Sequence, residues 1–200
     1  MIIDISIYDN LTSQNRGLFS DIIINPVITE NFRLRKHPNE LVDRWLLTEN
    51  RDYTTYNICM YGVKNYGDDH IVNITSFAKE LLNRDFNSIL IAGMRIGLLP
   101  YICKNAGIET DVVEISQEII NIVNPLGYLN GANIINDNIF TFTPTKQYDV
   151  ILLDIWNCDC DSNFDEQMTE LIAKYNQYLN EGGIIYIPIN KNGTKLFNKT

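Results

Sequence analysis

The stretch SILIAGMRIGLLPYI, from Ser88 to Ile102, decides the fold. A short isoleucine-rich run ends at Gly93, and a second apolar run with helical spacing follows Gly97. A buried strand that passes through a glycine turn into a helix is typical of parallel α/β sheets. Arg95 stands where many nucleotide-binding turns have a further glycine. The stretch therefore predicts a strand, a turn and a helix, and leaves open whether the turn holds a ligand.

Segments of helical and strand character alternate from residue 71 onward. Apolar residues at helical spacing predict helices at 72–86, 98–107, 117–127 and 162–183. Short apolar runs predict strands at 88–93, 110–116, 131–140, 148–156 and 184–189. Ser162 or Asn163 can cap the last helix, and a Gly-Gly pair is expected to end it. This alternation predicts a parallel sheet with helices on both faces.

Residues 1–70 have a different character and are expected to form an N-terminal β-rich region. Strands are predicted at 2–8, 21–29 and 54–63, and the run ENFRLRKHPNE at 30–40 is interpreted as a polar connection. We expect β-hairpins packed beside the parallel sheet. The chain is therefore divided into two domains, 1–70 and 71–200.

Composition limits the classes of function. The chain has 200 residues, 45% of them hydrophobic, and a net charge of −9. Such an acidic chain is not expected to present an extensive nucleic-acid surface, because that surface needs Lys and Arg to neutralise phosphates. No apolar run approaches the ~20 residues that span a bilayer, and the first residues lack the features of a signal peptide. We expect a soluble, cytoplasmic protein without membrane association.

The cysteines do not predict a disulfide framework or a metal site. Their spacing fits a reducing compartment. Cys158 and Cys160 lack the usual Cys-x2–4-Cys spacing of zinc sites, and both His37 and His70 are distant in sequence. We therefore expect no metal.

Acidic residues close three of the predicted strands. The second strand ends at Glu114, the third leads into Asp137, and the fourth ends at Asp154. Ligands of open parallel sheets bind beyond the carboxyl ends of the strands. One such acid, or one glycine turn, is equally typical of solvated loops and structural turns. Three acids in register with the Gly93 turn favour a ligand site.

An adenosine would give each of these residues a physical use. Glu114 lies about 20 residues after the first glycine, the usual distance for a carboxylate that binds ribose hydroxyls. Asp137, next to Asn138, can accept a hydrogen bond from the adenine amine, while Ile115 and Ile139 offer apolar faces to the ring. Asp154 is expected nearest the reacting end.

The order of these motifs resembles the class I S-adenosylmethionine-dependent methyltransferases, and within them the spermidine-synthase-like branch. The resemblance covers about residues 76–189 and rests on ILIAGMRIGLL, DVVEIS, NIINDNIFTF with YDVILLDIW, and LNEGGIIYI. It implies a Rossmann-like domain that binds S-adenosylmethionine. The cofactor-binding residues that it implies are Gly93, Arg95, Gly97, Glu114, Ile115, Asp137, Asn138 and Ile139.

Two departures from this family concern the chemistry. Arg95 replaces a glycine, and either pairs with the carboxylate of the cofactor's methionine tail or fills the site. Aminopropyltransferases have two acids after the fourth strand, and this chain keeps Asp154 but has Asn157 in the second place. The tyrosine-histidine motif of those enzymes is also absent. The cofactor is therefore better specified than the reaction.

The carboxyl end supplies at most one short element after the fifth strand. Either the sheet is truncated there, or the N-terminal strands cover its edge. Exposed edges favour association, so we expect a homo-oligomer. The acids after the fourth strand either attract a cationic substrate or, at Asp165 and Glu166, stabilise the first turn of a helix.

Three hypotheses of function follow. The first is a methyltransferase that acts on a small molecule, which can be a cation, and that uses Asp154 as base. The second is an aminopropyltransferase or another enzyme that acts on S-adenosylmethionine. The third is a catalytically silent binding or assembly subunit, which Arg95 and the short carboxyl end favour. A nicotinamide enzyme would leave Asp137 and Asp154 without a role.

Overall fold

The structure is a computed structural model. It describes residues 27–28, 31–36, 45–51, 54–61, 81, 84–95, 97–127, 129–156, 163–189 and 193–199. The predicted strand at 2–8, most of the predicted helix at 72–86 and the domain boundary at 70–71 lie outside the described residues, as do His37, His70, Asn157, Cys158, Cys160 and Ser162.

A six-stranded sheet forms the centre of the molecule. Its strands are β5 (Ser88–Ala92), β6 (Glu109–Glu114), β7 (Asn133–Asn136), β8 (Tyr148–Leu153), β9 (Leu179–Ile189) and β10 (Gly193–Asn198). The order is β10-β9-β8-β5-β6-β7, in which β10 alone of these six runs antiparallel to its neighbour. Counted from β5, this is the 3-2-1-4-5-6 order of doubly wound sheets. The predicted Rossmann-like fold is confirmed, and its strand order reverses between β5 and β8.

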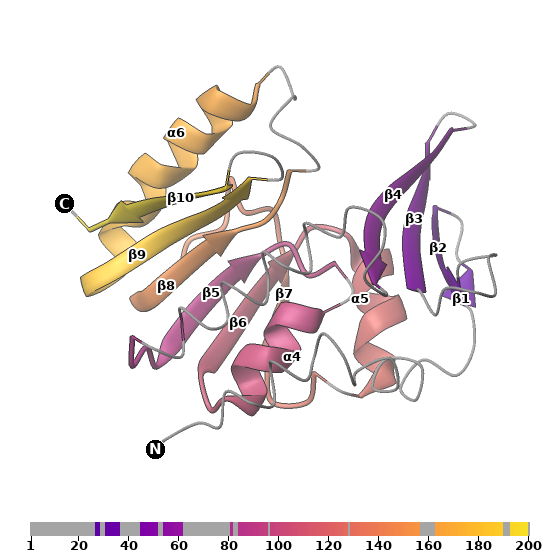
Figure 1. The fold of residues 1–200 in the computed structure, drawn as a ribbon, viewed down its shortest axis with the longest axis horizontal. Coiled ribbons are helices and arrows are strands. Elements are labelled where there is room, and N and C mark those ends of the chain that lie inside the picture. Colours follow the sequence, from indigo (N-terminus) through magenta and orange to yellow (C-terminus); the bar gives the residue numbers. More distant parts are fainter. Residues whose placement is uncertain are drawn as a thin grey trace.

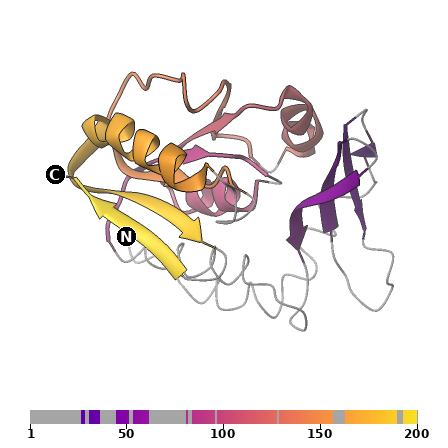
Figure 2. The same cartoon turned by 90° about the horizontal axis from the view of Figure 1, so that it is seen from above.

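Side chains of successive strand residues enter two separate cores. Ile89 and Ile91 of β5 pack on one face of the sheet, with the helices that follow β5 and β6. Leu90 and Ala92 pack on the other face, with the helix that precedes β9. All five residues of β5 are buried, as the continuous apolar run predicts for a strand covered on both sides. Figure 2 shows the molecule from above, with β9 and β10 (yellow) beside the helix that precedes β9 (orange).

In the part of the chain that the structure describes, three α-helices cover the sheet: α4 (Leu98–Asn105), α5 (Gln117–Val123) and α6 (Phe164–Tyr175). The Ser116 hydroxyl caps α5 by accepting a hydrogen bond from Ile119 N at 3.3 Å. Asn163 occupies the N-cap of α6 but makes no capping bond through its side chain. Within the described part of the chain, none of the helices has the length and apolar character needed to cross a bilayer.

The predicted end of the last helix is wrong. Helix α6 ends at Tyr175, the short 3-10 helix η3 (Asn176–Tyr178) follows, and the Gly-Gly pair belongs to β9. Leu179 is fully buried and pairs with Tyr148 of β8, so tertiary contacts start the strand early. A Cβ on Gly183 would stand 3.0 Å from the carbonyl oxygen of Asp149. The glycine therefore permits close approach of two strands and does not cap a helix.

The described residues of the N-terminal region form a separate antiparallel sheet of four strands. These are β1 (Val27–Ile28), β2 (Phe32–Lys36), β3 (Trp45–Arg51) and β4 (Thr54–Tyr61), which pair in chain order. The strand predicted at 54–63 is confirmed over Thr54–Tyr61, and the interpretation of 30–40 as a connection is wrong over Phe32–Lys36. The sequence FRLRK of β2 alternates apolar and basic residues with the period of a strand. Figure 1 shows this sheet beside α5, which β2 contacts.

Strand β10 lies at one edge of the central sheet. Its residues pair with β9 from Gly193 opposite Ile189 to Asn198 opposite Ile184. The described N-terminal strands pair with one another and lie past the carboxyl ends of the central strands, away from β10 (Figure 1). At this edge one short strand follows β9, as the sequence predicts. The described N-terminal strands do not cover it.

Candidate functional site

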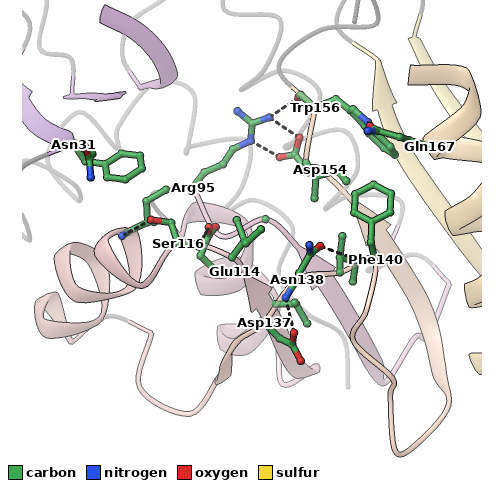
Figure 3. Close-up of a pocket in the computed structure, with 17 residues that line it drawn as sticks. Asn31, Arg95, Glu114, Ser116, Asp137, Asn138, Phe140, Asp154, Trp156 and Gln167 are labelled. Carbon is green, nitrogen blue, oxygen red and sulfur yellow. Dashed lines mark hydrogen bonds and ion pairs between the residues drawn. The ribbon is translucent and has the colours of Figure 1, made fainter. Parts of the chain in front are cut away.

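A pocket of about 640 Å³ lies at the carboxyl ends of β5, β6 and β8, where the strand order reverses. Ligand pockets are typically about 300–1,000 Å³, and open α/β sheets bind ligands at this edge. Most of the predicted site residues line this pocket (Figure 3): Gly93, Arg95, Glu114, Ile115, Asp137, Asn138, Ile139 and Asp154. Gly97 is not among the lining residues. It precedes α4 as its N-cap.

Gly93 lets the ends of β5 and β8 approach each other. Its φ is 92°, and a Cβ there would stand 2.4 Å from the carbonyl oxygen of Asp154. No side chain fits at that distance. The family resemblance implies that Gly93 contacts the cofactor, and the close neighbour of this glycine in the structure is the backbone at the end of β8.

Glu114 ties the glycine turn to the end of β6. The residue is buried, with 6% exposure, and its carboxylate accepts hydrogen bonds from Met94 N at 2.9 Å and Ser116 N at 2.8 Å. These bonds use one acceptor site on each oxygen, and a carboxylate oxygen has two. Glu114 can therefore position the turn and still accept hydrogen bonds from a ligand.

Arg95 forms a bidentate ion pair with Asp154. Its Nε lies 2.8 Å from Oδ2 and its Nη2 lies 2.9 Å from Oδ1, while Nη2 also donates to the carbonyl oxygen of Trp156 at 3.1 Å. The side chains of both charged residues are 12% exposed. Arg95 has φ 50°, a left-handed conformation that favours glycine. From the sequence, Arg95 was expected either to pair with a cofactor carboxylate or to fill the site. In the structure its carboxylate partner is Asp154 of the same chain (Figure 3).

Residues after β7 form another wall of the pocket. The Asp137 carboxylate accepts a hydrogen bond from Asn138 N at 2.6 Å and points away from the Arg95–Asp154 pair in Figure 3. The Asn138 amide oxygen accepts a bond from Phe140 N at 3.0 Å. The predicted strand at 131–140 therefore ends early, at Asn136, and a turn places these side chains at the pocket.

The two predicted apolar faces differ in exposure. Ile139 is buried, whereas Ile115 is 68% exposed at the edge of the pocket. A flat apolar ligand can cover a large apolar side chain that is exposed beside a pocket. The binding free energy becomes more favourable by about 25 cal/mol for each Å² of apolar surface removed from water.

Helix α6 holds the turn after β7 in place. Lys174 Nζ donates to the carbonyl oxygens of Ile139 and Phe140, at 3.2 and 2.7 Å. Tyr175 donates its hydroxyl to the Ile139 carbonyl at 2.7 Å. Burial lowers the pKa of Lys174, although nearby Glu170 and Asp137 act in the opposite direction, and burial raises the pKa of Tyr175. These side chains support the pocket wall from behind.

Several lining residues were not predicted. Trp156 is 9% exposed and packs edge-on against Phe164 at 5.0 Å between ring centroids. Its indole N–H donates to Gln167 Oε1 at 2.9 Å. Gln167 lies three residues after buried Phe164 on α6. A polar residue beside the apolar side of this helix could have indicated a pocket residue from the sequence. Asn31 and Phe32 gave no signal, because their segment was interpreted as a connection.

Carboxylates exceed cations in the pocket. The lining residues that the structure describes include three carboxylates, those of Glu114, Asp137 and Asp154, and one guanidinium, that of Arg95. This leaves an excess of two negative charges. A ligand with positive charge is favoured over one that carries a pyrophosphate.

No family model matches the chain, and no curated protein sequence matches it either. Among solved structures, the plantazolicin methyltransferase BpumL, in complex with a triazolic desmethylPZN analog and SAH, is 30% identical over 57% of this chain and 43% of that one, with a TM-score of 0.45. CalS10, an amino pentose methyltransferase from Micromonospora echinaspora with bound SAM, is 16% identical over 63% and 51%, with a TM-score of 0.48.

The glycopeptide N-methyltransferase MtfA, in complex with S-adenosyl-L-homocysteine, is 17% identical over 56% of this chain and 47% of that one, with a TM-score of 0.45. None of these three is a spermidine synthase. The chain spans about half the length of the structures it matches. The fold assignment rests on the strand order and not on these likenesses.

Proposed function

We propose that the protein is an S-adenosylmethionine-dependent methyltransferase that acts on a small molecule. One observation carries the proposal: Glu114, Asp137 and Asp154 line a single pocket beside the Gly93 turn, at the reversal point of a doubly wound sheet. Three independent strand ends supply these acids. The excess of carboxylates suits a sulfonium ligand and opposes the pyrophosphate of a nicotinamide cofactor.

The residues present fit an adenosine. Glu114 would accept hydrogen bonds from the ribose hydroxyls, because each of its oxygens keeps a free acceptor site beside the bonds from Met94 and Ser116. Asp137 and Asn138 would meet the polar edge of the adenine. Ile115, exposed at the pocket edge, would lie against a face of the ring, with Ile139 beneath.

The bound cofactor would supply a methyl group carried on a sulfonium. A lone pair of the acceptor would form a bond to the methyl carbon as the bond from that carbon to sulfur breaks. The protein's main task is to position the acceptor, since correct orientation removes much of the entropic barrier. Asp154 is proposed to take the proton that a nitrogen or oxygen acceptor loses. Gln167 and Trp156 lie on the same side of the pocket (Figure 3) and would contact the acceptor.

A catalytically silent binding subunit is the second candidate, and the ion pair of Arg95 with Asp154 favours it. Both oxygens of the expected base accept hydrogen bonds from the guanidinium. Such a carboxylate directs neither oxygen at a substrate in the arrangement observed. The aminopropyltransferase alternative is favoured by Asp154 alone, since Asn157 takes the place of the second acid of those enzymes. Homo-oligomer formation, a spermidine-synthase-like branch, a cationic acceptor and a cytoplasmic location stay predictions.

Calorimetry with S-adenosylmethionine and S-adenosylhomocysteine tests the proposal. We expect both to bind, and a protein with bound S-adenosylmethionine to release S-adenosylhomocysteine when supplied with a cell extract that contains the acceptor. Binding without release of that product under any extract would favour the silent subunit. Absence of binding would remove the cofactor and the methyltransferase together.

A further inference from the structure

We propose that the side-chain amide of Gln167 binds the methyl acceptor through a neutral carbonyl oxygen, and that this hydrogen bond selects the class of substrate. The inference deepens the proposed function and rests on it, because the acceptor is the second ligand of a methyltransferase. It concerns one atom of the acceptor. A positive charge elsewhere in the same molecule is compatible with it, whereas a carboxylate or phosphate at this point is not.

The indole of Trp156 fixes the orientation of the Gln167 amide. Trp156 Nε1 donates to Gln167 Oε1 at 2.9 Å, and an indole N–H is a donor that cannot accept. The amide oxygen must therefore face the indole, and the NH₂ group of the same amide is turned away from it. The indole is itself held in place, since Trp156 is 9% exposed and its ring packs edge-on against Phe164. Gln167 is thus left with donors for a ligand and no acceptor.

The NH₂ group of Gln167 is open to the pocket. Gln167 is half-buried and lines the pocket from α6, and the bond to Trp156 is the one that its side chain makes among the described residues. Within the part of the chain that the structure describes, a buried side-chain nitrogen or oxygen without a partner occurs only at Glu118 Oε2. The NH₂ group of Gln167 is therefore reached by solvent and is not sealed in the core. Two N–H donors are available to a ligand there.

An amide that presents only its donors favours a ligand oxygen with lone pairs. A carbonyl oxygen accepts these hydrogen bonds and brings no donor of its own that would need a partner. An ammonium group would meet N–H donors and lose hydration without replacement. An anionic oxygen would accept the bonds but would enter a pocket with an excess of two carboxylates. A neutral carbonyl, as in an amide, ester or ketone, meets both conditions.

The location of Gln167 gives this carbonyl a role in the reaction. Asp154, the proposed base, precedes Trp156 by two residues, and both line the same pocket as Gln167 (Figure 3). A carbonyl held by the amide therefore fixes one point of the acceptor on the wall that carries the base. Orientation of the acceptor is the main contribution that methyl transfer requires of a protein.

Two substitutions separate ligand recognition from packing. Gln167→Glu keeps an oxygen for the indole N–H but replaces the NH₂ group by a second acceptor oxygen. Trp156→Phe keeps an aromatic ring beside Phe164 but removes the N–H, so that the amide can turn its oxygen toward the pocket with no change in charge. Gln147→Glu adds the same negative charge at an exposed residue outside the pocket and is the matched control.

Three small probes are titrated into protein saturated with S-adenosylhomocysteine: N,N-dimethylacetamide, which has a carbonyl and no N–H, methylammonium and acetate. In protein labelled with ¹⁵N-glutamine, the side-chain NH₂ resonances of Gln167 are assigned by their loss in Gln167→Glu. These resonances should shift with dimethylacetamide and stay in place with methylammonium. Wild-type protein should bind dimethylacetamide more tightly than acetate, because acetate carries the charge that the pocket disfavours.

Affinities of the variants follow from the backbone amide resonances around the pocket. Gln167→Glu should bind dimethylacetamide at least ~5-fold more weakly than wild type, the factor that corresponds to about 1 kcal/mol for a lost hydrogen bond. Trp156→Phe should gain affinity for methylammonium, because the amide oxygen is released from the indole. Gln147→Glu should bind dimethylacetamide as wild type does. The shift of the wild-type Gln167 resonances decides the question if a variant does not fold.

The outcomes distinguish this proposal from the proposed function. Unmoved Gln167 resonances with dimethylacetamide, or equal affinity of wild type and Gln167→Glu for it, overturn carbonyl recognition while S-adenosylhomocysteine binding still supports the cofactor site. The titration is repeated without S-adenosylhomocysteine. A shift of the Gln167 resonances in protein that does not bind S-adenosylhomocysteine supports carbonyl recognition and removes the methyltransferase.

Discussion

The carboxylate of Glu114 accepts a hydrogen bond from the backbone N–H of Met94 at 2.9 Å, and so the acid that ends β6 fixes the turn that follows β5. The same carboxylate holds Ser116, the cap of α5. One buried side chain therefore sets the positions of a turn and a helix start on two sides of the pocket. Its structural and ligand-binding roles can be separated by experiment.

Replacement of Glu114 by Gln should lower both stability and affinity. The amide keeps one acceptor oxygen, so either Met94 N or Ser116 N loses its partner, at a cost of ~1–3 kcal/mol in the free energy of unfolding. Affinity for methylthioadenosine should fall about 10-fold or more, since 1.4 kcal/mol corresponds to a factor of ten. Urea unfolding and calorimetry measure the two effects. Glu166→Gln, exposed on α6, should change neither, and an equal loss in that control would rule out a specific role for Glu114.

Two glycines with similar backbone angles separate crowding from strain. Gly93 has φ 92° and a Cβ position 2.4 Å from the Asp154 carbonyl oxygen, whereas Gly107 has φ 81° and nothing within 4 Å of its Cβ position. Gly107→Ala should cost ~1–2 kcal/mol from the left-handed backbone alone. Gly93→Ala should cost ~1–3 kcal/mol more, the usual effect of overpacking. Equal unfolding free energies for the two variants would contradict the close approach of β5 and β8.

A buried acid at the opposite end of the sheet predicts a pH dependence of stability. Burial alone would raise the pKa of Asp111, but hydrogen bonds from Lys146, Tyr148 and Asn133 together lower it. The folded-state pKa thus lies below the unfolded value of about 3.9. The stabilisation is fully present above that unfolded value and is lost as the pH falls through the folded one.

Asp111→Asn should therefore be less stable than wild type near neutral pH. The difference in unfolding free energy should stay level down to about pH 5 and shrink below about pH 4, where wild-type Asp111 becomes protonated. Urea unfolding of both proteins across this interval measures it. A difference that persists undiminished in acid would show that the ionised carboxylate is not what stabilises the fold.

Lys174 is predicted to act on ligand binding from outside the pocket. Lys174→Met keeps the aliphatic length but removes the donor to the Ile139 and Phe140 carbonyls, and so loosens the turn that carries Asp137 and Asn138. We expect methylthioadenosine affinity to fall several-fold, with about 1 kcal/mol lost in stability. Lys174→Arg should restore part of the affinity. No change in affinity in Lys174→Met would remove this supporting role.

The sequence predicted the parts of the fold that local pattern determines. Strands β5, β6 and β8 are buried on both faces, so their unbroken apolar runs were sufficient to place them. The boundary between α6 and β9 was missed, because the burial of Leu179 against β8 overrides helical periodicity. Strand β2 was missed because its basic residues resemble those of a connection, and β3 was not predicted at all.

The same distinction applies to the site. Acids at strand ends could be placed at one edge of the sheet, because parallel strands bring their carboxyl ends together. The ion pair of Arg95 with Asp154 could not be predicted from the sequence. It joins residues from two different strand ends and depends on the left-handed turn at Arg95. Phe32 and Asn31 reach the pocket from a separate sheet whose position no local pattern encodes.

A crystal structure with bound S-adenosylhomocysteine tests the central claim most directly, namely that the acids of β6, β7 and β8 surround an adenosine. The account predicts ribose hydroxyls within hydrogen-bonding distance of the Glu114 carboxylate and the adenine against Ile115. A nucleoside bound elsewhere on the molecule, with the Glu114 pocket unchanged, would contradict it.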